Sequence, residues 1–120
     1  MYVDGYVIPL PKKAVAGYVK MARAAGKMWK EHGALEFREC VGDDLKTPYG
    51  TPFTKRMQLK PKETVFFSFV VYKSKAHRNA VNKKVMADPR MHKMMETMNK
   101  NMPFDTKRMA YGGFKVMVDL

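Results

Sequence analysis

The amino-acid sequence predicts an α+β domain in which one antiparallel sheet carries helices on one of its faces. Two observations indicate this class: segments rich in β-branched and aromatic residues, typical of strands, and between them segments whose apolar residues recur at the three- and four-residue spacing of helices. A third observation is the segment VFFSFVVY at 65–72, which is apolar at almost every position and therefore needs cover on both faces.

Length and composition indicate one domain over residues 1–120. Of the 120 residues, 46% are hydrophobic and 28% are charged, which is ordinary for a globular protein. Cys40 is the only cysteine, so no internal disulfide can form, as is usual in a reducing compartment. The sequence shows neither a signal-peptide pattern nor an apolar run of membrane-spanning length. We therefore expect a cytoplasmic protein.

The first strand and the first helix are predicted at the start of the chain. Residues 2–8, YVDGYVI, have strand character, and we expect the strand to end at Pro9 and Pro11, because proline cannot donate a ladder hydrogen bond. Residues 12–32 follow with a helical pattern and a basic outer face. Gly33 stands where the residue after a helix often adopts the left-handed conformation.

The second strand is predicted at 34–41, ALEFRECV. We expect it to be central or nearly so, where the charges of Arg38 and Glu39 would be costly unless they are paired. The proline- and glycine-containing residues 42–62 predict a long connection with a short element around 53–59. This connection is expected to act as a lid over a binding site.

The third strand is predicted at 64–73, and Ser74 is a good N-cap for a second helix. Asp88 precedes Pro89, and the residue before proline disfavours helical geometry, so the helix is expected to end there. The inward positions of this helix are predicted to include Ala76, Ala80, Val81 and Val85.

A shorter helix at 90–99 and a last strand at 107–119 complete the predicted elements. Within that strand, the pair Gly112–Gly113 suggests a bulge or the close approach of another backbone.

The predicted order, β-α-β and then β-α-β after the long connection, is that of the ferredoxin-like fold. Helices on one face can cover only one set of alternate residues in the third strand. The other set would remain as an exposed apolar patch, which soluble monomers rarely tolerate, so we expect a homodimer in which two sheets face each other. The two sets are Val65, Phe67, Phe69 and Val71, and Phe66, Val70 and Tyr72.

Several long segments carry a resemblance to a known family. They are MYVDGYVIPLPKK, MWKEHGALEFREC, VVYKSKAHRNAVNKKVMADPRM, MPFD and KRMAYGGFKVMVDL. In these segments the chain resembles the YbaA-like family of bacterial proteins, a domain-of-unknown-function family. The resemblance implies the dimeric α/β-barrel group of ferredoxin-like folds and therefore a homodimer. It brings no catalytic residues.

Polar side chains on apolar strands are the candidates for a ligand pocket. If the barrel holds such a pocket, Arg38 would hold an anionic group, and Glu39 or His77 could exchange protons with the ligand. Tyr6 and Tyr72 would orient it. The alternative for Arg38 and Glu39 is a salt bridge at a strand edge or between subunits.

The net charge of +12 leaves three kinds of function open. Small anionic molecules are plausible ligands of a basic protein. RNA is the alternative, bound through phosphates by Arg78, Lys83 and Lys84 of the second predicted helix. The charge can also serve solubility alone in a structural or interaction domain.

No cofactor or metal is predicted. His32, His77 and His92 lie far apart and show no HxH or HExxH pairing. No phosphate loop or nucleophile elbow is present, so neither a reaction type nor enzyme activity follows from a motif. The methionines between 91 and 102 recur at helical spacing, for which core or lid packing is the expected role and an adaptable pocket wall the alternative.

Overall fold

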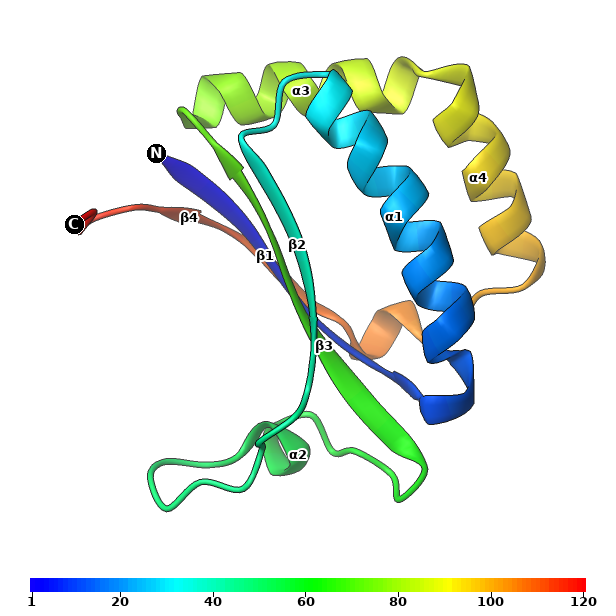
Figure 1. The fold of residues 1–120 in the computed structure, drawn as a ribbon, viewed down its shortest axis with the longest axis vertical. Coiled ribbons are helices and arrows are strands. Elements are labelled where there is room, and N and C mark those ends of the chain that lie inside the picture. The colour runs from blue at the N-terminus through cyan, green and yellow to red at the C-terminus, as the bar shows by residue number, and fades with distance from the viewer.

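Four antiparallel strands form one sheet in the order β2-β3-β1-β4, and three helices lie on one side of it (Figure 1). The structure is a computed structural model that describes residues 1–120. The predicted α+β class and the order of its elements are confirmed. The strands are β1 Tyr2–Pro11, β2 Glu36–Val41, β3 Glu63–Tyr72 and β4 Ala110–Lys115. The helices are α1 Val15–Glu31, α2 Phe53–Arg56, α3 Lys75–Ala87 and α4 Pro89–Lys100, with short 3-10 turns at Lys12–Ala14 and Thr106–Arg108.

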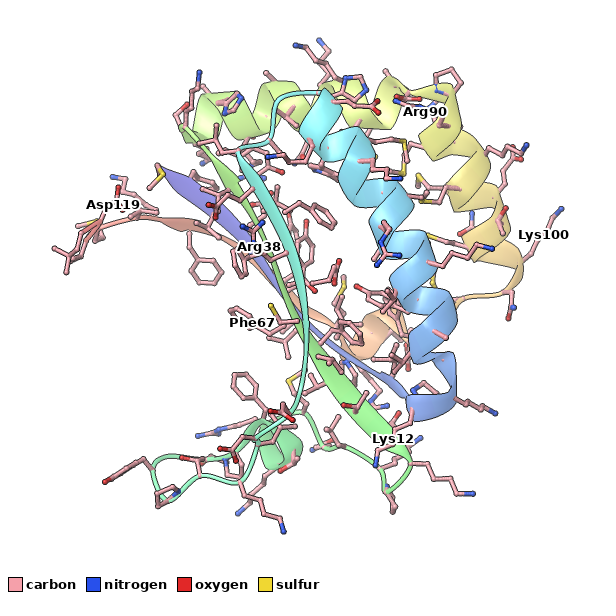
Figure 2. The ribbon with its side chains drawn as sticks, viewed as in Figure 1. Lys12, Arg38, Phe67, Arg90, Lys100 and Asp119 are labelled. Carbon is pink, nitrogen blue, oxygen red and sulfur yellow. The ribbon has the colours of Figure 1, made fainter.

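The two faces of β3 have different surroundings. Phe66, Val70 and Tyr72 face the helices and are buried, so this is the set of alternate residues that the helices cover. Phe67 points to the other side of the sheet, away from α1, and is 49% exposed (Figure 2). We call this second side, which carries no long helix, the open face.

Prolines do not end β1, contrary to the prediction. The strand runs to Pro11 and pairs with β3 along its whole length, with Pro9 opposite Val65. On its other edge β1 pairs with β4 only as far as Val7. Beyond Val7 that edge has no neighbouring strand, so a residue without an N–H group is tolerated there.

The predicted helix boundaries are confirmed by their caps. Gly33 follows α1 with φ +116°, a conformation that favours glycine. The Ser74 hydroxyl accepts a hydrogen bond of 3.0 Å from the His77 backbone N–H at the start of α3. Asp88 ends α3 and caps α4, where Pro89 occupies the first helical position.

β2 lies at the edge of the sheet, so its predicted central position is wrong. One backbone edge of this strand faces water, and a charged side chain there needs no protein partner. Arg38 accordingly is exposed, and its guanidinium donates only to the neighbouring Phe37 carbonyl, at 3.3 Å.

β4 is shorter than predicted and contains no bulge. Gly112 and Gly113 pair in regular register with Gly5 and Asp4. The close approach at Gly113 is made by a side chain, since a Cβ there would lie 2.9 Å from ring carbons of Tyr2. Glycine is therefore needed for packing at this position.

The core lies between the helices and the sheet, in two clusters. One gathers under α1 and the other under α3 and the start of α4. Ala76 and Ala80 were expected to face the core but are exposed, because Val81 and Val85 are the α3 residues that reach it. The first cluster is Ile8, Leu10, Tyr18, Ala22 and Phe66, and the second is Met28, Ala34, Val70, Tyr72, Val81, Val85 and Met91.

The long connection between β2 and β3 lies against one end of the open face. Its Leu45 and Phe53 line a small cavity of about 200 Å³ together with Val65 and Phe67. No helix in the structure combines the length and the apolar character that a membrane crossing requires.

Candidate functional site

Glu39 is the acidic side chain that β2 turns toward the helices. It lies opposite Ser68 of β3, on the covered face of the sheet. The Tyr18 hydroxyl of α1 donates a hydrogen bond of 2.9 Å to Glu39 Oε2, and the Ser68 hydroxyl donates to the same oxygen. Two elements, α1 and β3, therefore donate to one carboxylate oxygen of β2.

The two oxygens of Glu39 differ in their surroundings. Oε2 accepts from two hydroxyl groups, whereas no protein group donates to Oε1. Both oxygens of Asp4 are buried without a hydrogen-bond partner. Oε1 of Glu39 also has no partner, but it is not buried in this way. Because Glu39 lines an open cleft, Oε1 is the atom that a ligand can reach.

The surroundings of Glu39 shift its protonation. Burial raises the pKa of the Glu39 carboxyl above its usual range, and the hydrogen bonds from Ser68 and Tyr18 oppose this rise by favouring the ionised form. Burial, with the nearby Glu39 carboxylate adding to it, also raises the pKa of the Tyr18 phenol, so Tyr18 remains a hydrogen-bond donor at neutral pH. A carboxyl with a raised pKa beside a cleft is a candidate for proton exchange with a ligand.

We call the cleft beside Glu39 the α1–β2 cleft. It has a volume of about 560 Å³, within the range of small-molecule sites. Arg23, Lys27 and Lys30 of α1 line it, so its rim is basic. Besides Glu39, the only acidic residue that lines the cleft is Glu31, and its carboxylate is already paired with Arg90 at 2.7 Å. The full lining is Val19, Ala22, Arg23, Gly26, Lys27, Lys30, Glu31, Phe37 and Glu39.

Tyr6 lies close to this site, on the same face of the sheet. It pairs in register with Ser68, and its ring stacks on Tyr111 of β4 with centroids 4.8 Å apart. Burial raises the pKa of the Tyr6 phenol, and the neighbouring Tyr111 and Asp4 add more to this rise than Glu39 does. Tyr6 therefore lies near Glu39, with Ser68 between them, but it does not line the α1–β2 cleft.

Tyr72 and His77 lie at the other end of the covered face, at the start of α3. The Tyr72 hydroxyl donates to Asn82 Oδ1 at 3.2 Å. His77 accepts from the Lys73 backbone N–H at 2.9 Å, and its ring meets that of Tyr72 edge-on, with centroids 5.9 Å apart. Neither residue lines the α1–β2 cleft.

Arg38 belongs to the open face. It lies opposite Phe69 of β3, whereas the next residue, Glu39, points to the helices. Arg38 and Glu39 therefore cannot hold one ligand within a single subunit.

The three residues proposed for RNA binding have different surroundings. Arg78 is turned inward, where its Nε lies 3.8 Å from a carboxylate oxygen of the fully buried Asp4. Its guanidinium also lies over the Tyr2 ring, 5.0 Å from the centroid. Lys83 and Lys84 are exposed on α3.

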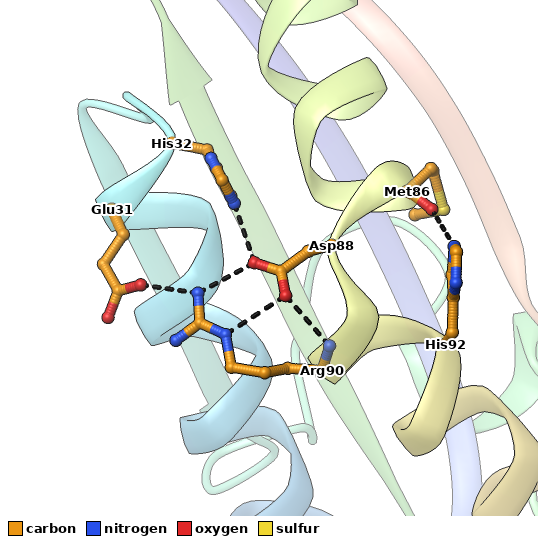
Figure 3. Close-up of polar contacts among 6 residues, drawn as sticks. All are labelled: Glu31, His32, Met86, Asp88, Arg90 and His92. Carbon is orange, nitrogen blue, oxygen red and sulfur yellow. Dashed lines mark hydrogen bonds and ion pairs between the residues drawn. The ribbon is translucent and has the colours of Figure 1, made fainter.

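The histidines make local contacts that fix the helices (Figure 3). His32 lies 2.9 Å from Asp88, which also binds Arg90, and Arg90 in turn binds Glu31. His92 contacts the Met86 carbonyl at 2.6 Å. No three His, Cys, Asp or Glu side chains gather closely enough to hold a metal ion.

The long connection was expected to act as a lid, but it lines no part of the α1–β2 cleft. The sequence pattern placed Tyr18 within the first predicted helix without indicating its hydrogen bond to Glu39. The available signal was chemical, because a buried tyrosine hydroxyl needs a hydrogen-bond partner, and a glutamate on a neighbouring strand can supply it.

Comparisons with known proteins confirm the resemblance found in the sequence. The family model described as protein of unknown function (DUF1428) matches residues 1–106. The uncharacterized protein YbaA of Escherichia coli (strain K12) is 42% identical over 118 residues, which cover 98% of this chain and 97% of that protein. The YbaA protein of Shigella flexneri matches equally.

Solved structures share the fold at low sequence identity. An uncharacterized NIPSNAP domain protein from Burkholderia xenovorans has a TM-score of 0.58 at 15% identity, covering 97% of this chain and 94% of the other. A protein from Deinococcus radiodurans, with the provisional description of antibiotic biosynthesis monooxygenase, has a TM-score of 0.59 at 10% identity, covering 100% and 96%. These likenesses concern the fold alone.

Proposed function

This chain belongs to the DUF1428 family, and we propose that it binds a small polar anion in the α1–β2 cleft, where Glu39 exchanges a proton with the ligand. The observation that carries the proposal is the arrangement of the Glu39 carboxyl. One of its oxygens is fixed by Tyr18 and Ser68, and the other faces a basic cleft without a protein donor. Glu39 makes no ion pair within the chain, so a salt bridge inside one subunit does not account for it.

The rim of the cleft favours an anion. Arg23 and Lys27 make no ion pair within the chain, so their charges are available to a ligand, and the Lys30 ammonium is held by the Leu35 carbonyl at 2.7 Å. An anion held at this rim would raise the pKa of Glu39 further through like-charge repulsion. The protonated carboxyl can then donate a hydrogen bond or a proton to the bound anion.

The fold supports a small-molecule role in general terms. A fold shared with a protein provisionally described as an antibiotic biosynthesis monooxygenase can bind small molecules, and the proposal takes no reaction from that likeness. Arg38 stays a candidate for contacts on the open face, and Tyr72 and His77 for contacts near α3. Tyr6 lies next to Ser68 on the same face of the sheet and does not line the cleft.

The open face supports a homodimer of the dimeric α/β-barrel kind. Phe67 and Phe114 are 49% and 61% exposed on it, and they line an apolar trough of about 560 Å³. Patches of this kind usually mark interfaces, and a second copy related by a two-fold axis is the simplest cover. Cys40 is an exposed free thiol next to this face, which fits a reducing compartment such as the cytoplasm.

A ligand-observed NMR screen tests the cleft. Its probes are small polar anions: inorganic phosphate, sugar phosphates, dicarboxylates and amino acids. We expect at least one anion to bind the wild type, to lose binding in Lys27→Glu, and to keep it in Lys83→Glu, a charge-matched control on α3. An absence of binding, or equal loss in both variants, would overturn the proposal.

A further inference from the structure

A second concave surface lies on the other side of α1, and it differs in chemistry from the α1–β2 cleft. α1 lies between β2 and α4 (Figure 1), and the groove between α1 and α4 has a volume of about 760 Å³. We call it the methionine groove. Its walls are Tyr18, Met21, Met94, Met98 and Met102.

The two helices that form this groove are joined at both of its ends. At one end Arg90 of α4 binds Glu31 of α1 at 2.7 Å (Figure 3). At the other end Phe104, which follows α4, packs edge-on against Tyr18, with ring centroids 5.9 Å apart. The groove between these two contacts is lined by the first half of α1 and by the length of α4.

The methionines at this groove are only partly used by the core. Met91 is buried, whereas Met94 and Met98 are half-buried and Met102 is 39% exposed. Methionine is unbranched and polarisable, so a wall of methionines adapts to apolar ligands of varied shape. Packing against the sheet explains Met91, and it leaves the exposed sides of the other three without a partner.

The charges around the groove all have one sign. Lys13, Lys20 and Lys93 line it without an ion-pair partner in the chain, and Arg90 is already bound to Glu31 and Asp88. No aspartate or glutamate is among its 16 lining residues. The complementary ligand therefore combines an apolar body with an anionic group.

We propose that the methionine groove binds a monomeric amphiphilic anion, meaning an aliphatic or aromatic body that carries one acidic headgroup. The apolar body lies along Met21, Met94 and Met98, and the headgroup meets Lys20 or Lys93. The volume suits a molecule of this size. The groove lies on the helix side of the sheet, so pairing of two open faces would leave it accessible.

Fluorescence titration with dansylaminoundecanoic acid, kept below its micelle concentration, tests this site. We expect saturable binding by the wild type and a weakening of about tenfold in the double variant Lys20→Glu/Lys93→Glu, because whichever lysine meets the acidic headgroup is then replaced by a like charge. The charge-matched double variant Lys83→Glu/Lys84→Glu on α3 should bind like the wild type. Lys30→Glu, in the α1–β2 cleft, should do so as well.

Two methionine variants, one in the groove and one outside it, test the apolar wall. Met98→Gln keeps an unbranched side chain of similar length but should weaken binding about threefold or more, since it removes apolar contact with the ligand body. Met86→Gln, at an exposed methionine of α3, should have no effect. Circular dichroism of each variant checks that the fold is retained.

Three outcomes would overturn the proposal. The wild type could fail to bind the probe, the α3 variants could weaken binding as much as the groove variants, or the corresponding uncharged alcohol could bind as tightly as the acid. Co-sedimentation with phosphatidylglycerol vesicles distinguishes a membrane surface from a free ligand. Binding to vesicles without binding to the monomeric probe would also contradict the proposal.

Discussion

The hydroxyl group of Tyr18 donates a hydrogen bond of 2.9 Å to Oε2 of Glu39 and so joins α1 to the edge strand β2. Tyr18 is buried, and its ring also packs on Phe66, with centroids 4.7 Å apart. The bond therefore lies between the apolar core and the α1–β2 cleft. It holds one oxygen of Glu39 in place and leaves the other toward the cleft.

The first prediction concerns this bond. Replacement of Tyr18 by Phe removes a donor that favours the ionised carboxylate, so the pKa of Glu39 should rise further. Carbon NMR of the glutamate side chains measures it, with Tyr49→Phe, at an 84% exposed tyrosine, as the control. An unchanged or lower pKa in Tyr18→Phe would show that the bond does not act on Glu39.

The second prediction compares two glycines of α1. A Cβ at Gly17 meets no atom within 4 Å, so Gly17→Ala should stabilise the protein by about 0.5–1 kcal/mol through helix propensity. A Cβ at Gly26 would lie 2.6 Å from the Phe37 ring. Gly26→Ala should therefore be less stable than Gly17→Ala by about 1–3 kcal/mol, the usual cost of overpacking.

Urea unfolding at neutral pH measures this difference. Both variants gain helix propensity, and Gly26→Ala gains at least as much because it lies in the interior of α1, so a lower stability of Gly26→Ala reports the contact between α1 and β2. Equal stability of the two would mean that Phe37 moves freely, and that the inner wall of the α1–β2 cleft is not rigid.

The third prediction concerns acid. Arg108 donates to both oxygens of Glu63, at 2.6 and 2.9 Å, and these hydrogen bonds, together with one from the Lys60 backbone N–H at 2.8 Å, lower the pKa of the carboxyl to about 2. A depressed pKa stabilises the fold at pH values above the unfolded pKa of about 4.3. That contribution should be lost as the pH falls from about 4.3 toward about 2.

Thermal unfolding across this pH range provides the check. Glu63→Gln should lower the melting temperature at neutral pH and flatten its fall in acid, whereas Glu96→Gln on the exposed face of α4 should follow the wild type. If Glu63→Gln kept the full acid sensitivity, the stabilisation would lie in other carboxylates, such as Asp88.

The fourth prediction concerns the open face. If a second copy covers it, sedimentation equilibrium at micromolar concentration should show a dimer, and Phe67→Glu should yield a monomer because it places a charge in an apolar interface. Tyr49→Glu, in the long connection, is the matched control and should remain dimeric. A stable wild-type monomer would rule out the sheet-to-sheet assembly.

The sequence predicted the elements well because their signals are local. Gly33 and Ser74 mark helix ends through their own backbone and side-chain chemistry, and both predictions are confirmed. The first strand was predicted to end at Pro9, which is wrong, because proline is excluded from a strand only where its missing N–H would face a neighbouring strand. Whether β4 extends that far depends on residues about a hundred positions later in the chain.

The site was harder to predict because its partners meet through the tertiary fold. Glu39 stood out as a charge on an apolar strand, but the position of β2 at the edge follows from the pairing order and not from its own residues. Tyr18 fits an apolar helix stripe equally well with or without a polar partner. The spacing of Met94 and Met98 likewise predicted a shared helix face without showing whether another element covers it.

A pH titration of the Glu39 carboxyl carbon by NMR, without added anion and then with each anion of the panel in turn, measures whether Glu39 exchanges a proton with a bound anion. We expect a pKa above the ordinary value of about 4.3 in the free protein and a further rise with at least one anion, with no comparable change at the exposed Glu96. An ordinary pKa for Glu39 that no anion alters would rule out proton exchange in the α1–β2 cleft.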